Sequence, residues 1–144
     1  MKRREPLRAA ASALLLVLSA CRGETEQRGR GEAERFARAV SALRDADNAA
    51  KRPLLAALSA MRCAEPSACE LQRVCSDAYR AHLEGVQKSE QVRSNLDARD
   101  AAVAARTADL LHELDSAEQL LRMAREGTRQ CTELEGKLRR QYRV

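Results

Sequence analysis

Apolar residues recur every seven positions through the last third of the sequence, and this recurrence constrains the fold more than any other feature. Such spacing places side chains in one stripe along an α-helix. The best part of the stripe, residues 110–124, covers about two heptads, fewer than a sustained coiled coil needs. The stripe comprises Leu96, Val103, Leu110, Ala117, Ala124, Cys131 and Leu138, with Leu114, Leu121 and Tyr142 beside it and Thr107, Thr128 and Glu135 interrupting it. We therefore predict a long, coiled-coil-like C-terminal helix.

The composition favours helix in the rest of the chain as well. Alanine, arginine, leucine and glutamate dominate, and the 144 residues include one Phe, two Tyr and no Trp. These abundant residues are strong helix formers. We find no convincing strand, and the scarcity of aromatic side chains argues against a deep apolar ligand pocket. The predicted fold class is all-α, as an elongated helical hairpin or a small bundle of two to four helices.

The first twenty residues have the pattern of an export signal. Four basic residues precede an uncharged, mainly apolar run at 9–20, which ends in small side chains. The run is too short to cross a bilayer core, which needs about 20 apolar residues. A basic start followed by a short apolar region is typical of a secretory signal peptide.

The end of this run, Leu18-Ser19-Ala20-Cys21, resembles the lipobox of bacterial lipoproteins. The resemblance covers only the signal region. It implies that residues 1–20 are removed and that Cys21 becomes the first residue, lipidated with diacylglycerol and a further acyl chain such as palmitate. Two or more chains give stable membrane anchoring. Arg22 replaces the aspartate that favours inner-membrane retention in enteric bacteria, so the resemblance implies the periplasmic side of the outer membrane. The alternative is a signal anchor with an ordinary cysteine at position 21.

Removal of the signal changes the charge balance of the protein. The signal holds four of the 26 basic and one of the 21 acidic residues, so the remaining chain has 22 against 20. Nucleic-acid binding requires a clustered basic face, and we expect no nucleic-acid partner. Residues 21–31 form the lipidated cysteine and a glycine-rich flexible tether that spans roughly 17 Å. Residues 32–144 form a single helical domain.

Residues 32–62 carry apolar side chains at steps of three and four, the period of a helix. The members are Phe36, Val40, Leu43, Ala50, Leu54, Ala57 and Met61. Pro53 lies inside this pattern, where proline removes a backbone hydrogen bond and clashes with the preceding turn. We expect either a kink near residues 48–52 or two helices joined there.

A further boundary lies at "AEPSACE", residues 64–70. Pro66 disfavours helix at the preceding residue, and Ser67 with Glu70 has the spacing of a capping box. We predict a helix that begins at Ser67. Its apolar seam comprises Ala68, Leu71, Cys75, Ala78, Tyr79, His82 and Val86.

Four cysteines remain once Cys21 is set aside, and in an exported protein disulfides are the default state. Four cysteines allow three connectivities. Cys75 and Cys131 lie on predicted apolar seams, whereas Cys63 ends one helix and Cys69 begins the next. We predict disulfides Cys63–Cys69 and Cys75–Cys131. Neither the spacing of a usual zinc site nor the C-x-x-C of a redox site is present, so we expect no metal and no cofactor.

The sequence also lacks a recognisable catalytic constellation. His112 is followed by Glu113 but has no second histidine at the spacing of H-E-x-x-H, and no G-x-S-x-G is present. We expect His82 to be partly buried with a local partner. We assign no catalytic residues and do not expect an enzyme.

These expectations together describe a lipid-anchored envelope protein that acts as a non-catalytic interaction or scaffold module. The partner would be another protein, or a second copy of the chain, held by the helix predicted over 96–142. The alternative is a small periplasmic regulator or inhibitor that binds a specific enzyme or toxin. The design is similar to the small peptidoglycan-linked lipoprotein of enteric bacteria, but Val144 stands where that family has its linking lysine. The basic tail, which includes Lys137 and Arg140, complements the dipole of a helix C-terminus.

Overall fold

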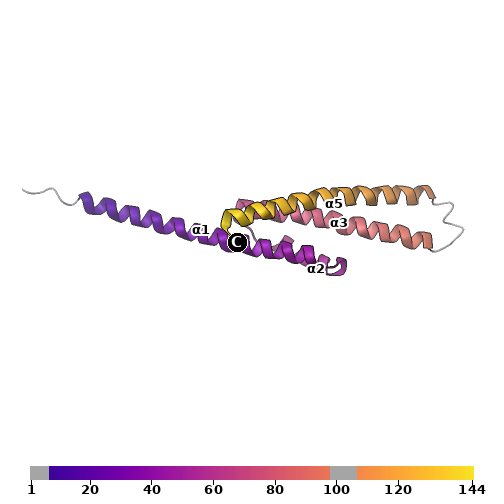
Figure 1. Ribbon diagram of the computed structural model, residues 1–144, viewed down its shortest axis with the longest axis horizontal. Coiled ribbons are helices and arrows are strands. Elements are labelled where there is room, and N and C mark those ends of the chain that lie inside the picture. Colours follow the sequence, from indigo (N-terminus) through magenta and orange to yellow (C-terminus); the bar gives the residue numbers. More distant parts are fainter. Residues whose placement is uncertain (1–6, 98–106) are drawn as a thin grey trace, which may run out of the picture.

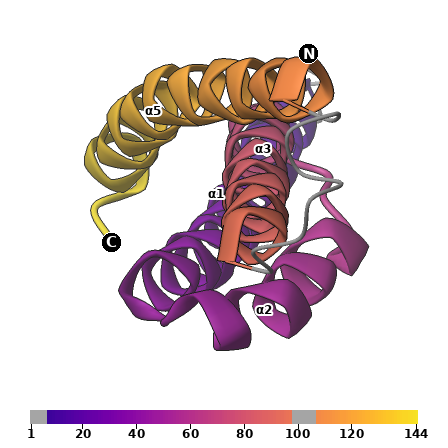
Figure 2. The ribbon, with the colours of Figure 1, turned by 90° about the vertical axis from the view of Figure 1, so that its right-hand side faces the viewer.

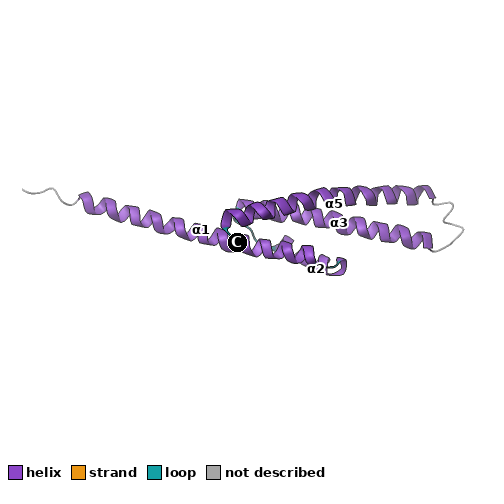
Figure 3. Ribbon diagram, viewed as in Figure 1, coloured by secondary structure: helices purple, strands orange, loops and turns teal. Residues whose placement is uncertain are grey.

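The computed structural model describes the backbone of residues 7–97 and 107–144, and the side chains of residues 26–97 and 107–144. Every regular element in these ranges is a helix (Figure 3). The helices are α1 (Leu7–Asp45), α2 (Asn48–Ala60), α3 (Pro66–Asp97) and α5 (Thr107–Tyr142). The predicted all-α class, with a helical bundle and disulfides, is therefore confirmed.

Helices α3 and α5 form a long antiparallel hairpin, and α1 and α2 pack against the part of it away from the connecting residues (Figure 1). Viewed end-on, α3 lies between α5 and α2 (Figure 2). The hairpin therefore extends beyond α1 and α2 at one end of the molecule. The N-terminal half of α1 extends beyond the hairpin at the other end.

The apolar stripe predicted for α5 is the face that packs inside the molecule. All five of its seven-residue positions within α5 are buried: Leu110, Ala117, Ala124, Cys131 and Leu138. The helix continues unbroken through Gly127. A Cβ built at Gly127 would lie 2.8 Å from the Cβ of Ala78 on α3. The glycine therefore allows the two helices to approach closely.

Of the two arrangements expected near Pro53, a kink or two joined helices, the structure shows two helices, because α1 ends at Asp45 and α2 begins at Asn48. Asp47 caps α2, because its Oδ1 accepts a hydrogen bond from the Ala50 backbone N–H at 2.8 Å. Pro53 itself lies inside α2. At the other end of α2, the Gln72 side-chain amide donates to the carbonyls of Leu58 and Met61, each at 2.8 Å. The Leu58 carbonyl also accepts from the Met61 backbone N–H at 3.2 Å, so Gln72 of α3 and the backbone together cap this end of α2.

The start of α3 differs by one residue from the prediction. The helix begins at Pro66, and its first backbone bond runs from Cys69 N–H to the Glu65 carbonyl at 3.0 Å. Proline is favoured at the first helical position because its missing N–H has no helical partner there. Ser67 lies inside the helix and donates to the Glu65 carboxylate at 2.9 Å. The capping box predicted for Ser67 and Glu70 is therefore not the cap used.

The expected flexible tether also differs from the structure. Residues 22–31 continue α1, and among them Gly29 is buried. A Cβ at Gly29 would lie 2.9 Å from the ring of Tyr142. Nearby, Glu32 Oε1 accepts from the backbone N–H groups of Ala64 and Glu65 at 2.6 and 3.1 Å. The glycine was interpreted as a source of flexibility, whereas it gives a ring room to pack against a helix.

The C-terminus of α5 closes with a turn that ties down the last residue. Arg143 adopts a left-handed conformation with φ of 55°, and Val144 N–H donates to the Arg139 carbonyl at 3.1 Å. This is the hydrogen-bond pattern of a Schellman motif. Val144 packs against the core, whose fully buried side chains include Phe36, Leu43, Leu58, Leu71 and Leu138. The core that the structure describes and both disulfides thus lie within residues 33–144.

Candidate functional site

The predicted lipidation site, Cys21, lies outside the residues whose side chains the structure describes. Its position along the chain is nevertheless informative. Gly29, eight residues further on, is already packed against the C-terminal turn of α5. In the helical backbone of α1, eight residues correspond to about 12 Å. A lipid on Cys21 would therefore place the end of the bundle that holds Tyr142 close to the bilayer.

Both predicted disulfides are confirmed. Cys63 bonds to Cys69 across the turn between α2 and α3, and Cys75 bonds to Cys131 between α3 and α5. The second bond is buried, since Cys75 and Cys131 are 0% and 1% exposed. Both cysteines belong to the core cluster that includes Phe36 of α1 and Leu58 of α2, so the bond crosslinks the hairpin at the end that α1 and α2 cover.

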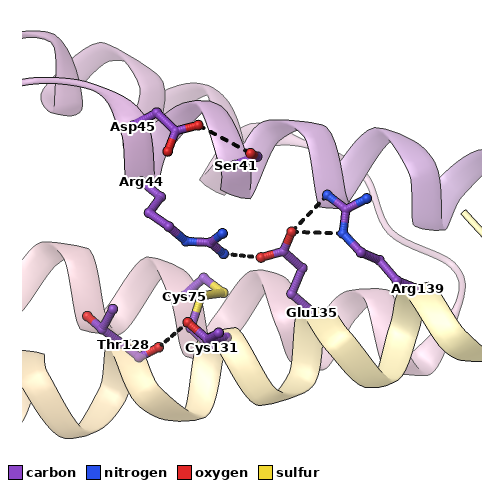
Figure 4. Close-up of polar contacts among 9 residues, drawn as sticks. Ser41, Arg44, Asp45, Cys75, Thr128, Cys131, Glu135 and Arg139 are labelled. Carbon is purple, nitrogen blue, oxygen red and sulfur yellow. Dashed lines mark hydrogen bonds and ion pairs between the residues drawn. A yellow bond between two sulfur atoms is a disulfide. The ribbon is translucent and has the colours of Figure 1, made fainter.

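Glu135 was interpreted as an interruption of the apolar stripe, but it is a buried carboxylate at the centre of a partly exposed ion cluster (Figure 4). Its carboxylate, 6% exposed, pairs with Arg44 of α1 and with Arg139 one turn along α5 at 2.9 Å. A buried carboxylate requires such partners, because desolvation without them is costly. Burial raises the pKa of Tyr79, and the neighbouring Arg44 opposes this shift. The cluster therefore fixes α1 against the hairpin.

The two histidines lie in different surroundings. His82 is partly buried, and its Nε2 lies 3.1 Å from Oδ1 of Asn48, which agrees with the expected local partner. Burial and the charge of Lys51 lower the pKa of His82. His112 is exposed on α5, where it lines a depression of about 430 Å³ with Asn95 and Asp109.

The free end of the hairpin exposes leucines that the sequence analysis did not single out as a surface. Leu111 and Leu114 are 62% and 39% exposed, and Leu96 on α3 is 54% exposed. The hairpin is antiparallel, so the end of α3 lies beside the start of α5. We call Leu96, Leu111 and Leu114 the tip leucines. The heptad pattern did place Leu96 on the stripe, but the stripe loses its covering helices at this end.

Acidic side chains outnumber basic ones in the segments that carry the tip leucines. Among the described residues 89–97 and 107–118, six exposed carboxylates accompany one arginine, Arg93. The six are Glu90, Asp97, Asp109, Glu113, Asp115 and Glu118, of which Asp97 and Glu118 are in ion pairs. Residues 98–106 add two arginines and one aspartate in the sequence. The tip therefore combines exposed leucines with an excess of acidic side chains, which we call its acidic rim.

The rest of the described surface offers a further hollow. An open groove of about 440 Å³ between α2 and α3 is lined by Arg52, Ser59, Arg80 and Glu84, among others. The described part of the chain holds no group of three or more histidine, cysteine or carboxylate side chains placed to bind a metal ion. No helix within the described residues is long and apolar enough to cross a membrane.

The fold is a disulfide-crosslinked hairpin of α3 and α5, with α1 and α2 packed against one end of it. Comparisons with family models, with curated proteins and with solved structures gave no match. Function is therefore argued from the sequence motif and from the surfaces of the chain itself.

Proposed function

We propose that the protein is a lipid-anchored component of a bacterial envelope and serves as a non-catalytic interaction module. The lipobox at residues 18–21 supports the anchor, and two disulfides suit an oxidising compartment. The contact surface is the hairpin tip. The observation that carries this assignment is the exposure of the tip leucines beyond the reach of α1 and α2.

The stripe on α5 favours a different protein, and not a second copy of the chain, as the partner. Its buried positions already pack inside the molecule, against α3 and the core. A coiled coil between copies would have to open the hairpin first. The tip leucines are free of this conflict, and contiguous exposed apolar groups mark contact surfaces. Like-charged acidic rims also disfavour tip-to-tip pairing of two copies.

The alternative function is a regulator or inhibitor that binds and blocks a specific envelope enzyme or toxin. The same tip favours this alternative, because an apolar patch on a monomer suits insertion into a partner's groove. The two functions differ in what happens to the partner. A scaffold leaves the activity of its partner unchanged, whereas an inhibitor reduces it.

The anchor is tested by growing cells with an alkyne-tagged fatty acid. We expect the protein to take up the tag and the Cys21→Ser variant to lose it, because the thiol is the acceptor. Cys63→Ser is the matched control, since it removes a thiol that is engaged in a disulfide. Equal labelling of the Cys21→Ser variant and the wild-type protein would exclude lipidation at this residue.

The contact surface is tested by placing a photocrosslinking amino acid at Leu111 in living cells. We expect a defined protein adduct from this position and none from Gln130, an exposed residue further along α5. Identification of the adduct and an activity assay with added soluble domain separate scaffold from inhibitor. A dimer of the chain as the sole adduct, with light scattering showing dimers in solution, would contradict the heterologous contact.

A further inference from the structure

The fold gathers unpaired cations at the end of the bundle that follows the lipidation site. The C-terminal turn of α5 lies beside residues 29–30 of α1, since Gly29 contacts the Tyr142 ring and Arg30 Nη2 lies 3.5 Å from the Arg143 carbonyl. The turn between α2 and α3 joins them through Glu32, which binds the backbone of residues 64 and 65. Three segments distant in sequence thus meet at one end.

We call the exposed cations of this end the basic end. Its members are Arg28, Arg30, Arg62, Lys137, Arg140 and Arg143. No carboxylate lies within ion-pair distance of any of the six among the described residues. Of the exposed arginines elsewhere, Arg38, Arg73, Arg80 and Arg122 have acidic partners, whereas Arg52 and Arg125 bind only an amide and a backbone carbonyl. The acids here are engaged inside the protein: Glu32 holds the backbone and Glu65 binds Ser67. Glu26 on α1 and Glu70 near the start of α3 are exposed carboxylates, and neither forms an ion pair with the six.

We propose that the basic end binds anionic phospholipid headgroups and forms a second membrane contact beside the lipid on Cys21. The inference rests on the proposed anchor, because the anchor sets which end faces the bilayer. In α1, seven residues separate Cys21 from Arg28, about 10 Å of helix. This distance is close to one Debye length at physiological salt, so Arg28 is within reach of the surface potential, and the other five cations extend the same end of the bundle. Cations near an anionic surface each contribute about fivefold to binding.

Membrane phosphates are favoured over other polyanions because of this position. The six cations come from α1, α5 and the turn after α2, the three segments that meet at the end leading to the anchor. A bilayer that holds the lipid lies next to this end, whereas a soluble polyanion would have to reach the same cations beside the membrane. Binding of the basic end to the membrane would point the hairpin tip away from the bilayer.

The test measures vesicle binding by residues 21–144 carrying Cys21→Ser, which contain the core of the described residues and both disulfides. Vesicles are phosphatidylcholine alone or phosphatidylcholine with phosphatidylglycerol. The test variant combines Arg28→Gln, Arg62→Gln, Lys137→Gln and Arg140→Gln. The control combines Arg38→Gln, Arg73→Gln, Arg80→Gln and Arg122→Gln, which removes the same net charge from paired sites elsewhere. Circular dichroism verifies that both variants are folded.

We expect the parent domain to bind the phosphatidylglycerol vesicles and not phosphatidylcholine alone, with binding lost in high salt. The test variant should bind at least tenfold more weakly, and the control within about threefold of the parent. Equal loss in both variants would reduce the effect to net charge and overturn the proposal, as would no binding by the parent domain. Displacement by inorganic phosphate at constant ionic strength would also overturn it, in favour of a free-phosphate site. Fatty-acid labelling at Cys21 is independent of all these outcomes, so failure here leaves the anchor intact.

Discussion

The two disulfides close loops of very different length, and their contributions to stability should differ accordingly. Cys75 and Cys131 are 56 residues apart in sequence, whereas Cys63 and Cys69 are 6 apart. In the chain-entropy treatment, a crosslink stabilises by restricting the unfolded chain, and the effect grows with the logarithm of loop length. For these separations it gives about 4 kcal/mol for the long loop and about 2 kcal/mol for the short one.

The perturbation is a pair of double variants, Cys75→Ala with Cys131→Ala and Cys63→Ala with Cys69→Ala. A packing effect adds to the difference between them. The first pair is fully buried, so its removal leaves a cavity in the seam, whereas the second pair is partly exposed. We therefore expect the first double variant to lose at least about 2 kcal/mol more of the free energy of unfolding than the second.

Urea unfolding followed by circular dichroism measures these losses. Extrapolated free energies should be compared, and not midpoints alone, because a crosslink changes the surface that the unfolded chain exposes and hence the slope. Wild-type protein reduced before unfolding is the matched control, since it loses the crosslinks and keeps its side-chain volume. Equal losses in the two double variants, or a larger loss from the Cys63–Cys69 pair, would refute the loop-length reasoning.

Three further predictions concern individual positions. In the same assay, Gly127→Ala should lower the free energy of unfolding by about 1–3 kcal/mol, because the new Cβ meets Ala78 at 2.8 Å. Gly31→Ala, whose new Cβ meets nothing within 4 Å, should raise the free energy of unfolding by up to about 1 kcal/mol. Arg143→Gly should raise the free energy of unfolding by about 0.5–1 kcal/mol, since φ is 55° there and glycine adopts this conformation without strain. An unchanged free energy of unfolding would argue against that turn. The pKa of His82 is lowered by burial, so the folded protein releases this proton more readily than the unfolded chain, whose histidine pKa is about 6.5. The stabilising contribution of neutral His82 is present above that value and lost on acidification. An NMR titration should therefore place the His82 midpoint below about 6.5. Between about pH 7.5 and 5.5, the free energy of unfolding of the His82→Gln variant should fall less than that of the wild-type protein.

The helices and disulfides were predictable because both depend on local periodicity. A seven-residue stripe fixes which side of α5 is buried whatever that side packs against, and all five stripe positions in α5 are buried. Once Cys75 and Cys131 lie on seams, pairing between neighbouring helices follows. Lipidation at Cys21 and the envelope location stay predictions.

The features that sequence reasoning missed are those set by tertiary contact. Glu135 interrupts an apolar pattern unless Arg44, 91 residues away in sequence, lies opposite it. Gly29 indicates flexibility by itself, and only the ring of Tyr142 gives it another role. The exposure of Leu111 depends on where α1 and α2 stop covering the hairpin, and residue spacing along α5 carries no information about that.

The basic end and the tip lie at opposite ends of α5, and this separation makes their roles independent. From Leu110 to Leu138 the helix rises about 42 Å, several Debye lengths at physiological salt. Substitutions this far apart, with no shared partner, have additive effects. The four glutamine substitutions at the basic end should therefore leave the photocrosslink from Leu111 unchanged in yield relative to protein present. A lost crosslink would mean that the orientation of the hairpin on the membrane, and not only its attachment, determines whether the tip reaches its partner. That result would join the two surfaces in one function, because the tip leucines could then reach the partner only when the basic end is bound to the membrane.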